Sequence, residues 1–236
     1  MISDKFLDKY DIGSFYMKIH EISLTKDIQQ VRDTMPLIDI FGRYGWQYLG
    51  KGNEAAVAQH PNKDYVIKVF ESASPFKEFY KICQEHPNIH YPKFLSKIKI
   101  VPNTQNYWSF VRMEKLQKIN DSTLLGKYFP EVIYTLDSAL KARLKSGLGG
   151  GMHEVIEDHV IKRFGKNIWD RSGRRLQVNK EILWTVHQSI TDTWKEAVKH
   201  ITDKAVELNL GRLDLHASNF MTRGSTLVIL DPLQGI

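Results

Sequence analysis

The stretch LDLHASN at residues 213–219, followed twelve residues later by Asp231, decides the fold class of this chain. An aspartate five residues before an asparagine has the spacing of a catalytic loop, in which Asp214 accepts the proton of an attacking hydroxyl. Asn219 and Asp231 then offer oxygen ligands to magnesium on nucleotide phosphates. Each residue alone is more typical of an ordinary turn or loop, but the ordered set predicts the base-and-metal half of a phosphotransferase site.

The sequence after Asn219 supports this interpretation. Residues 228–230 form a short apolar run typical of a buried strand, and Asp231 follows at its C-terminal end. Pro232 cannot donate to a strand ladder and ends the run. Residues 223–225 have turn composition. We therefore expect Asn219 and Asp231 to flank a small hairpin, with both side chains near its open end.

A second motif lies in the first third of the chain. The stretch LGKGNEAAVA at residues 49–58 holds Gly50 and Gly52 in a G-x-G-x-x-A pattern, which is weak evidence by itself. It is followed by DYVIKVF at residues 64–70, where Lys68 lies at the centre of an apolar strand. A buried ammonium without a partner is costly, and the phosphates of ATP would provide the anion. The alternative is a lysine that reaches solvent from an edge strand.

Together these motifs resemble those of the early Ser/Thr protein kinases of T-odd (podovirus-type) bacteriophages, over residues 46–116 and 181–236. The resemblance implies an α+β, protein-kinase-like two-lobed fold in one domain, 1–236. A helical extension, 1–45, and a small β-rich N-lobe, 46–116, would precede a helical C-lobe, 117–236, truncated after the metal-binding aspartate. The chain ends five residues after that aspartate.

The resemblance also implies an activity. Members of the family use ATP and Mg²⁺ to phosphorylate host proteins, including the transcription and RNA-processing machinery, and can phosphorylate themselves. The implied site consists of the base Asp214, the catalytic and phosphate-binding Lys68, the loop glycines Gly50 and Gly52, and the magnesium ligands Asn219 and Asp231. Backbone groups of Glu114 and Leu116, in a hinge at residues 113–116, would bind adenine.

Departures from the wider kinase pattern leave alternatives open. His216 stands two residues after the base, as in aminoglycoside phosphotransferases, where protein kinases usually have lysine. Pro232 and Leu233 replace the usual Phe-Gly, and because proline fixes φ we expect this segment not to flip. The alternatives are a small-molecule kinase, favoured by His216 and by the short C-terminus, and a non-catalytic kinase-fold module that binds a host factor.

The acidic partner of Lys68 is not fixed by the sequence. Kinases typically pair this lysine with a glutamate on the next helix, which we predict at residues 74–85. Glu78 is the candidate, Glu71 and Glu85 are further options, and the phosphates alone are another. The predicted apolar face of this helix is Phe76, Phe79, Tyr80 and Cys83.

The remaining elements follow from periodicity. Strands are predicted at residues 46–49, 97–101 and 108–113, with a turn at 102–106. Helices are predicted at residues 24–34, 124–145 and 181–208, and the last ends with C-cap chemistry at Asn209. The glycine-rich run at 147–151 has no following Lys-Ser/Thr pair, so we interpret it as a connector.

Composition limits the compartments and the classes of partner that suit this chain. The chain has 236 residues, 42% of them hydrophobic, and one cysteine, Cys83, which excludes an internal disulfide and suits a reducing host cytoplasm. No run is long enough to span a membrane, and the N-terminus lacks a signal-peptide pattern. The net charge of +6 suits acidic proteins or nucleic-acid-bound machinery, or is ordinary solubilising charge.

Three further patterns bear on binding. A basic cluster, 162–175, with Phe164 and Trp169 interleaved, is either a docking patch for an acidic partner or RNA, or a solvated insert. The histidines at 153, 159, 187 and 200 lack metal-ligand spacing, so no zinc site is predicted. No Ser-His-Asp set is expected from the local sequence.

Overall fold

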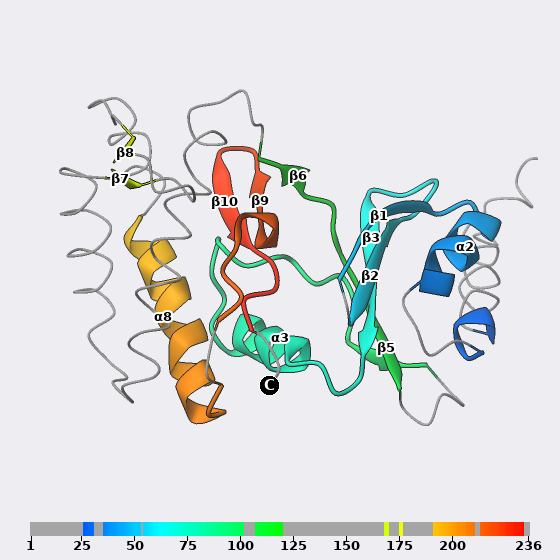
Figure 1. The fold of residues 1–236 in the computed structure, drawn as a ribbon, viewed down its shortest axis with the longest axis horizontal. Coiled ribbons are helices and arrows are strands. Elements are labelled where there is room, and N and C mark those ends of the chain that lie inside the picture. The colour runs from blue at the N-terminus through cyan, green and yellow to red at the C-terminus, as the bar shows by residue number, and fades with distance from the viewer. Residues whose placement is uncertain are drawn as a thin grey trace, which may run out of the picture. The chain divides into compact units, whose positions relative to one another are not determined.

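The computed structural model forms two compact units. The first unit consists of residues 1–73 and 94–115, and the second unit of residues 74–93 and 116–236. The described residues are 26–30, 35–52, 54–101, 107–119, 191–210 and 213–233, with the backbone of 168–169 and 175–176. Figure 1 gives the element labels. The predicted N-lobe, 46–116, included residues 74–93, which group here with the second unit; the lobe boundaries themselves stay a prediction.

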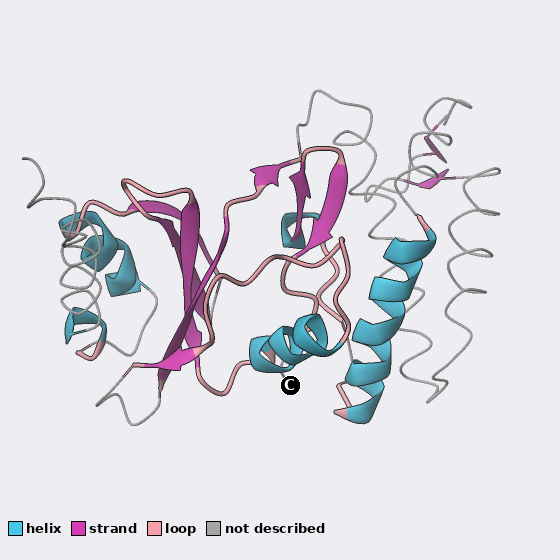
Figure 2. Cartoon of the chain, turned by 180° about the vertical axis from the view of Figure 1, so that it is seen from behind, coloured by secondary structure: helices cyan, strands magenta, loops and turns pink. Residues whose placement is uncertain are grey.

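The first unit contains a five-stranded antiparallel sheet, drawn as magenta arrows in Figure 2, in the order β1-β2-β3-β5-β4. Its strands are β1 (Gln47–Lys51), β2 (Ala55–Gln59), β3 (Tyr65–Glu71), β4 (Lys99–Ile100) and β5 (Trp108–Glu114). The two long strands are rich in β-branched and aromatic residues, which suit a pleated, buried surface. The predicted strands are confirmed, and so is the α+β class.

Helix α2 (Met35–Arg43) lies against one face of this sheet. Its residues Leu37, Ile40 and Phe41 share one hydrophobic cluster with Ile67 and Val69 of β3. The sequence predicted a helix at 24–34 that stopped before Pro36. In the described part of that range only residues 26–28 are helical, and α2 instead starts at Met35. Proline is tolerated in the first helical turn, because its missing N–H has no partner there.

Lys68 belongs to the opposite face of β3, because neighbouring residues in a strand alternate between faces. Its side chain is nevertheless buried, with 6% of its surface exposed. Strand β3 pairs with β2 on one side and with β5 on the other, so Lys68 is central in the sheet. The alternative of a lysine on an edge strand is therefore wrong.

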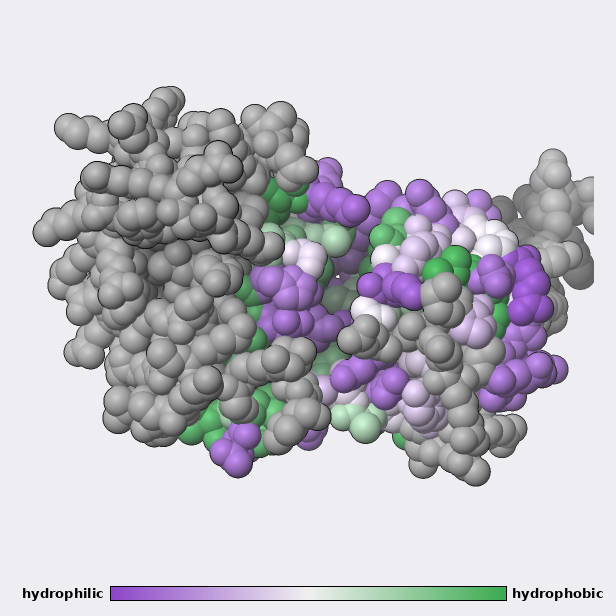
Figure 3. Space-filling model, in the orientation of Figure 1, coloured by the Kyte–Doolittle hydropathy of each residue, from purple (hydrophilic) through white to green (hydrophobic). Residues whose placement is uncertain are grey.

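The face of the first unit that is visible in Figure 3 is mainly polar where its residues are described. Figure 3 shows hydrophilic colours over most of its described residues, with smaller hydrophobic areas between them. Among the described residues of this unit, the exposed large hydrophobic side chains are Leu49, Leu95 and Ile100. Among the described residues of the whole chain, no helix is both long enough and apolar enough to cross a bilayer.

The second unit contains two described helices and a small sheet. The helices are α3 (Phe76–Glu85) and α8 (Asp192–Glu207), and the three-stranded sheet has the order β10-β9-β6. The strands are β6 (Gln117–Lys118), β9 (Phe220–Arg223) and β10 (Thr226–Ile229), with a 3-10 helix η3 (Ala217–Asn219) before β9 and a separate pair, β7 (Ile168–Trp169) and β8 (Arg175–Leu176).

Helix α3 confirms the predicted helix but corrects its apolar face. Phe76, Phe79 and Cys83 are buried as expected, and the fourth buried residue is Ile82. Tyr80, which was predicted to be part of this face, is only half buried. Ile82 lies three residues after Phe79, so it belongs to the same face of a 3.6-residue helix.

Helix α8 precedes the motif at residues 213–219 and has defined ends. It begins where the Thr191 side chain accepts a hydrogen bond from the backbone N–H of Trp194, at 3.2 Å. It ends with Asn209 in the left-handed region, φ +52°, as its predicted capping role requires. The N–H groups of Asn209 and Leu210 donate to the carbonyls of Val206 and Ala205, at 3.0 and 2.8 Å.

Several predictions lie outside the described residues. They are the helix at 124–145, the connector at 147–151, the start of the helix predicted at 181–208, and the turn at 102–106. The side chains of the basic cluster, 162–175, also lie outside them.

Candidate active site

The hairpin predicted after Asn219 is present. Strands β9 and β10 pair antiparallel, with Phe220 opposite Ile229, and the turn is made by Gly224 with a positive φ of 59°. The backbone N–H of Leu230 donates to the carbonyl of Asn219 at 2.9 Å. Asn219 thus directly precedes the hairpin, and Asp231 follows it at its open end, as the sequence predicted.

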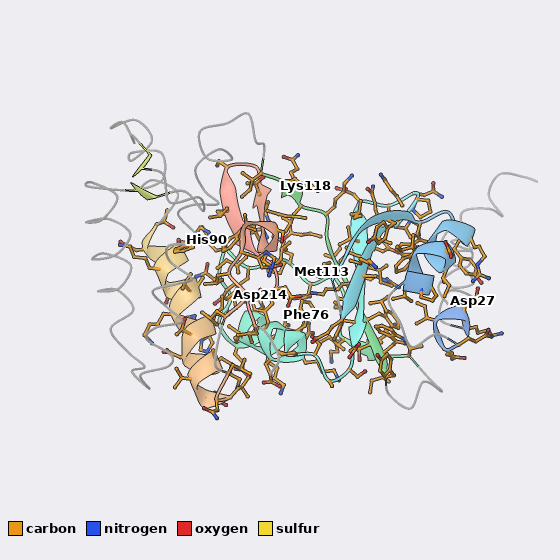
Figure 4. The ribbon with its side chains drawn as sticks, in the orientation of Figure 1. Asp27, Phe76, His90, Met113, Lys118 and Asp214 are labelled. Carbon is orange, nitrogen blue, oxygen red and sulfur yellow. The ribbon has the colours of Figure 1, made fainter. Side chains whose placement is uncertain are left out.

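A second short pairing holds Asp214 beside this open end, where Figure 4 labels it. The N–H of Asp214 donates to the carbonyl of Pro232 at 2.7 Å, and Leu213 forms an antiparallel bridge with Leu233. Leu213 and Leu215 are buried on either side of Asp214. Because extended residues alternate, the two leucines anchor the backbone while the Asp214 carboxylate stays 32% exposed.

The Asn219 amide connects the three motif residues. Its Nδ2 donates to the Asp214 carbonyl at 2.7 Å, to Asp214 Oδ2 at 3.0 Å and to the Asp231 carbonyl at 2.9 Å. Two of these acceptors are backbone carbonyls, which can only accept, so the NH₂ group must face them. The amide Oδ1 is therefore directed elsewhere and can serve as an oxygen ligand.

This donor set suits magnesium. Mg²⁺ is usually held by one or two protein oxygens, and substrate phosphates and water complete its octahedral shell. The Asn219 amide oxygen and the Asp231 carboxylate would provide such ligands at the open end of the hairpin. Among the described residues there is no group of three His, Cys, Asp or Glu side chains that could hold a metal. The site would thus depend on the nucleotide for its other ligands.

Two neighbours of Asp214 in the loop contact each other, and one of them, His216, also contacts the carboxylate. Ser218 Oγ lies 2.6 Å from His216 Nδ1, and His216 Nε2 lies 3.3 Å from Asp214 Oδ1. The expectation of no local Ser-His-Asp set is therefore wrong as a statement about geometry. The 3-10 turn of η3 brings Ser218 back to His216, which residue composition does not reveal.

His90 is a residue of this region that the sequence analysis missed. It is buried, with 3% exposed, and its Nδ1 lies 2.6 Å from the carbonyl of Leu227 in β10. Its Nε2 lies 3.0 and 3.1 Å from the hydroxyls of Thr191 and Thr193 at the start of α8. Its carbonyl accepts from the Ile229 N–H at 2.8 Å. Burial is the main cause that lowers the pKa of His90, and the nearby Arg223 adds to it.

Arg223, on the other strand of the hairpin, also binds the segment that contains His90. Its Nη1 donates to the Ile89 carbonyl and its Nη2 to the Tyr91 carbonyl, both at 2.9 Å. The Tyr91 hydroxyl donates to the Ala197 carbonyl in α8 at 2.8 Å. Residues 89–91 therefore connect the hairpin that carries the motif to helix α8.

The glycine and lysine motif is assembled within the first unit. In the sheet register, Lys68 lies opposite Val57, and Val57 lies opposite Gly50. Directly opposite residues share one face of an antiparallel sheet, so Gly50 and Lys68 share theirs. Gly52 donates its N–H to the Ala55 carbonyl at 2.8 Å and helps to close the turn. A Cβ at either glycine would meet no atom within 4 Å, which leaves room for a ligand near this backbone.

The acidic candidates for Lys68 have other contacts. Glu78 accepts from Lys81 at 2.7 Å and lies 3.7 Å from Lys204. Glu71 accepts from the Tyr107 hydroxyl at 2.8 Å. Glu71 lies three positions from Lys68 in β3, so alternation places it on the opposite face of the strand. The pairing of Lys68 with Glu78 or Glu85 stays a prediction.

The predicted adenine contacts stay predictions. Glu114 is the last residue of β5 and lies opposite Tyr65 in the register. Leu116 follows between β5 and β6 and is half buried.

Comparison with known proteins gives a distant likeness in structure. No protein-family model and no curated protein matches the chain. A thermostable mutant of aminoglycoside phosphotransferase APH(4)-Ia, solved as a ternary complex with AMP-PNP and hygromycin B, is 13% identical with a TM-score of 0.34, over 81% of this chain and 68% of that one. Another structure of APH(4)-Ia is 12% identical with a TM-score of 0.33, over 84% and 71%. Likeness at this level carries no argument about activity, which rests on the residues above.

Proposed function

We propose that this protein is an ATP- and Mg²⁺-dependent phosphotransferase with a protein-kinase-like fold, and that its acceptor is a Ser or Thr hydroxyl. The observation that carries the proposal is the Asn219 amide, which binds Asp214 and the backbone of Asp231 together and leaves Oδ1 as a ligand. A loop that needed only a turn cap would not require this ordered set of base, amide and second carboxylate.

Within this set Asp214 would be the general base. Its carboxylate is partly exposed and is oriented by Asn219 on one oxygen and by His216 on the other. An acceptor hydroxyl that enters beside it would donate its proton to this carboxylate as it attacks the γ-phosphate. Asn219 and Asp231 would hold a magnesium ion, which neutralises phosphate charge when bound.

Lys68 would contact the nucleotide phosphates. Its ammonium is buried in the central strand of the sheet, where a partner anion lowers the cost of the charge. Protein kinases place the phosphate-binding lysine on this third strand, after a glycine-rich hairpin. Gly50 and Gly52, in the hairpin before it, leave open space at the backbone.

The acceptor and the biological setting extend the proposal. The resemblance to bacteriophage Ser/Thr kinases supports a phage enzyme that acts in the host cytoplasm on host proteins, including transcription or RNA-processing machinery, and on itself. The net charge of +6 would favour encounter with acidic partners.

A second candidate is a kinase that phosphorylates small molecules. His216 favours it, because aminoglycoside phosphotransferases have histidine two residues after the base. The two candidates share the chemistry of Asp214, Asn219, Asp231 and Lys68 and differ only in the acceptor.

Phosphate transfer from labelled ATP tests the proposal. Purified protein with magnesium should label itself or polypeptides of a bacterial lysate, and Asp214→Asn should reduce the rate by about 100- to 10,000-fold, the usual effect of losing a general base. Asp203→Asn, the same change at a partly exposed residue of α8 that pairs with Lys199, is the matched control and should retain the wild-type rate. Lys68→Ala should also abolish transfer, and Lys63→Ala in an exposed turn should not.

The outcomes separate the candidates. Labelled polypeptides support the protein kinase. Labelled small metabolites with unlabelled polypeptides support the small-molecule kinase. Undiminished transfer in both Asp214→Asn and Lys68→Ala would reject the assigned site.

A further inference from the structure

We infer that His216 is a positioning residue for the base Asp214, and that Ser218 selects the imidazole tautomer that this role needs. The inference rests on the proposed function and assigns roles to two residues of the same loop. It starts from the contact chain described above, in which Ser218 Oγ, the His216 ring and Asp214 Oδ1 follow one another at 2.6 and 3.3 Å.

For a neutral imidazole, the chemistry of the three groups favours one position of the ring proton. An ionised carboxylate can only accept, so the nitrogen that faces Asp214 Oδ1 must carry the proton. That nitrogen is Nε2, and a neutral imidazole then has a lone pair on Nδ1. Ser218 is placed to donate its hydroxyl hydrogen to this lone pair. The opposite tautomer would set two lone pairs against each other between His216 and Asp214.

Each oxygen of the Asp214 carboxylate then has a neighbouring nitrogen that orients it. Asn219 Nδ2 donates to Oδ2 at 3.0 Å, and His216 Nε2 lies 3.3 Å from Oδ1. Each carboxylate oxygen has a second lone pair, so the group can still accept the proton of an incoming hydroxyl. Losing His216 leaves Asn219 alone to orient the carboxylate, and a base that is misplaced by about 1 Å can lose about 100-fold in rate.

The same three residues could also be interpreted as a nucleophilic serine with a histidine base. The geometry favours the positioning role. His216 and Ser218 are both exposed and lie two residues apart, and Asp214 is itself held by Asn219 in the proposed metal loop. A nucleophilic Ser218 would instead react with a fluorophosphonate probe, which gives a direct distinction.

A pair of near-isosteric variants tests the role of His216. Glutamine can place its amide nitrogen near the position of Nε2, whereas asparagine is one methylene shorter and cannot reach it. We expect His216→Asn and His216→Leu to reduce kcat by about 10- to 100-fold while KM for ATP stays within about twofold. His216→Gln should recover most of the wild-type kcat. Equal rates for the glutamine and asparagine variants would overturn the inference.

Ser218 has its own test. Ser218→Ala should lower kcat by about fivefold, the effect of one neutral hydrogen bond. Ser225→Ala, the same change in the exposed hairpin turn, should have no effect. If Ser218→Ala lowers kcat as much as His216→Leu, or if a fluorophosphonate labels Ser218, the serine is more than a tautomer selector and the inference fails.

A measurement without turnover separates this inference from the proposed function. Long-range ¹H–¹⁵N NMR spectra of the His216 ring report which nitrogen carries the proton. We expect the Nε2–H tautomer in the wild type and a mixture in Ser218→Ala. Protonation at Nδ1 in the wild type would overturn the inference even in an active enzyme. Absence of any phosphate transfer by the wild type would instead count against the proposed function.

Discussion

The loop and hairpin at residues 213–233 and the brace at residues 89–91 hold the same site by different means. In the loop, the Asn219 amide reaches partners only five and twelve residues away. In the brace, His90 reaches partners that are 101 to 137 residues away. The grouping of Asp214, Asn219 and Asp231 follows from nearby sequence and was predicted. The contacts of His90 depend on how distant segments meet and were missed. The residues proposed for the chemistry thus lie close together in sequence, whereas contacts that hold their segment in place join distant parts of the chain.

The largest effect is expected from Asn219→Asp, in the loop. The variant replaces the donor NH₂ by a charged oxygen that faces three acceptors, two of them backbone carbonyls. We expect phosphate transfer to fall at least about 100-fold, and the free energy of unfolding to fall by about 1–3 kcal/mol. Kinetic assays and urea unfolding measure the two effects. Asn62→Asp in an exposed turn is the control, and similar losses there would show a general effect of charge.

The brace should matter more for stability than for the chemical step. His90→Leu removes the ring that bonds to Leu227, Thr191 and Thr193, and leaves a buried carbonyl without this partner. We expect a loss of about 1–3 kcal/mol in the free energy of unfolding, measured in urea. His86→Leu, the same change at an exposed histidine, should lower the free energy of unfolding by less. An unfolding midpoint equal to that of the wild type would show that the brace is not needed.

The smallest expected effect is a dependence of stability on pH. Burial lowers the pKa of His90 below its ordinary value of 6.5, so the unfolded chain takes up a proton at a higher pH than the folded one. Stability should therefore be constant above about pH 7.5 and decrease as the pH falls through about 6.5, with a slope of at most about 1.4 kcal/mol per pH unit for each such group.

His200, whose pKa is also lowered mainly by burial, should add to this slope. Unfolding curves between pH 5.5 and 8 measure it, and His90→Leu should reduce it. An unchanged slope in this variant would assign the effect to other groups.

Alternation and motif spacing predicted much of the fold. The strands around Lys68, the turn at Gly224 and the placement of Asn219 and Asp231 follow from local patterns that the structure preserves. The prediction of a helix that ends before Pro36 was wrong, because α2 starts at Met35 and proline is as compatible with a first helical turn as with a helix end.

The neighbours of the candidate site were harder to predict. His216 and Ser218 were read as separate residues, because their contact depends on a single 3-10 turn. His90 and Arg223 gave no signal at all. Both residues bind partners that are more than 100 residues away in the sequence. Hydrophobic periodicity does not predict such contacts.

The bridge between Leu213 and Leu233 has a consequence for how the chain reaches its native state. It joins the two ends of a short loop, so little chain entropy opposes its closure, and contacts of low sequence separation form quickly. We therefore expect the catalytic loop to be largely organised in the folding transition state, with α8 and the segment around His90 docking later. Mutations in the bridge should then slow refolding, whereas those at His90 should mainly speed unfolding.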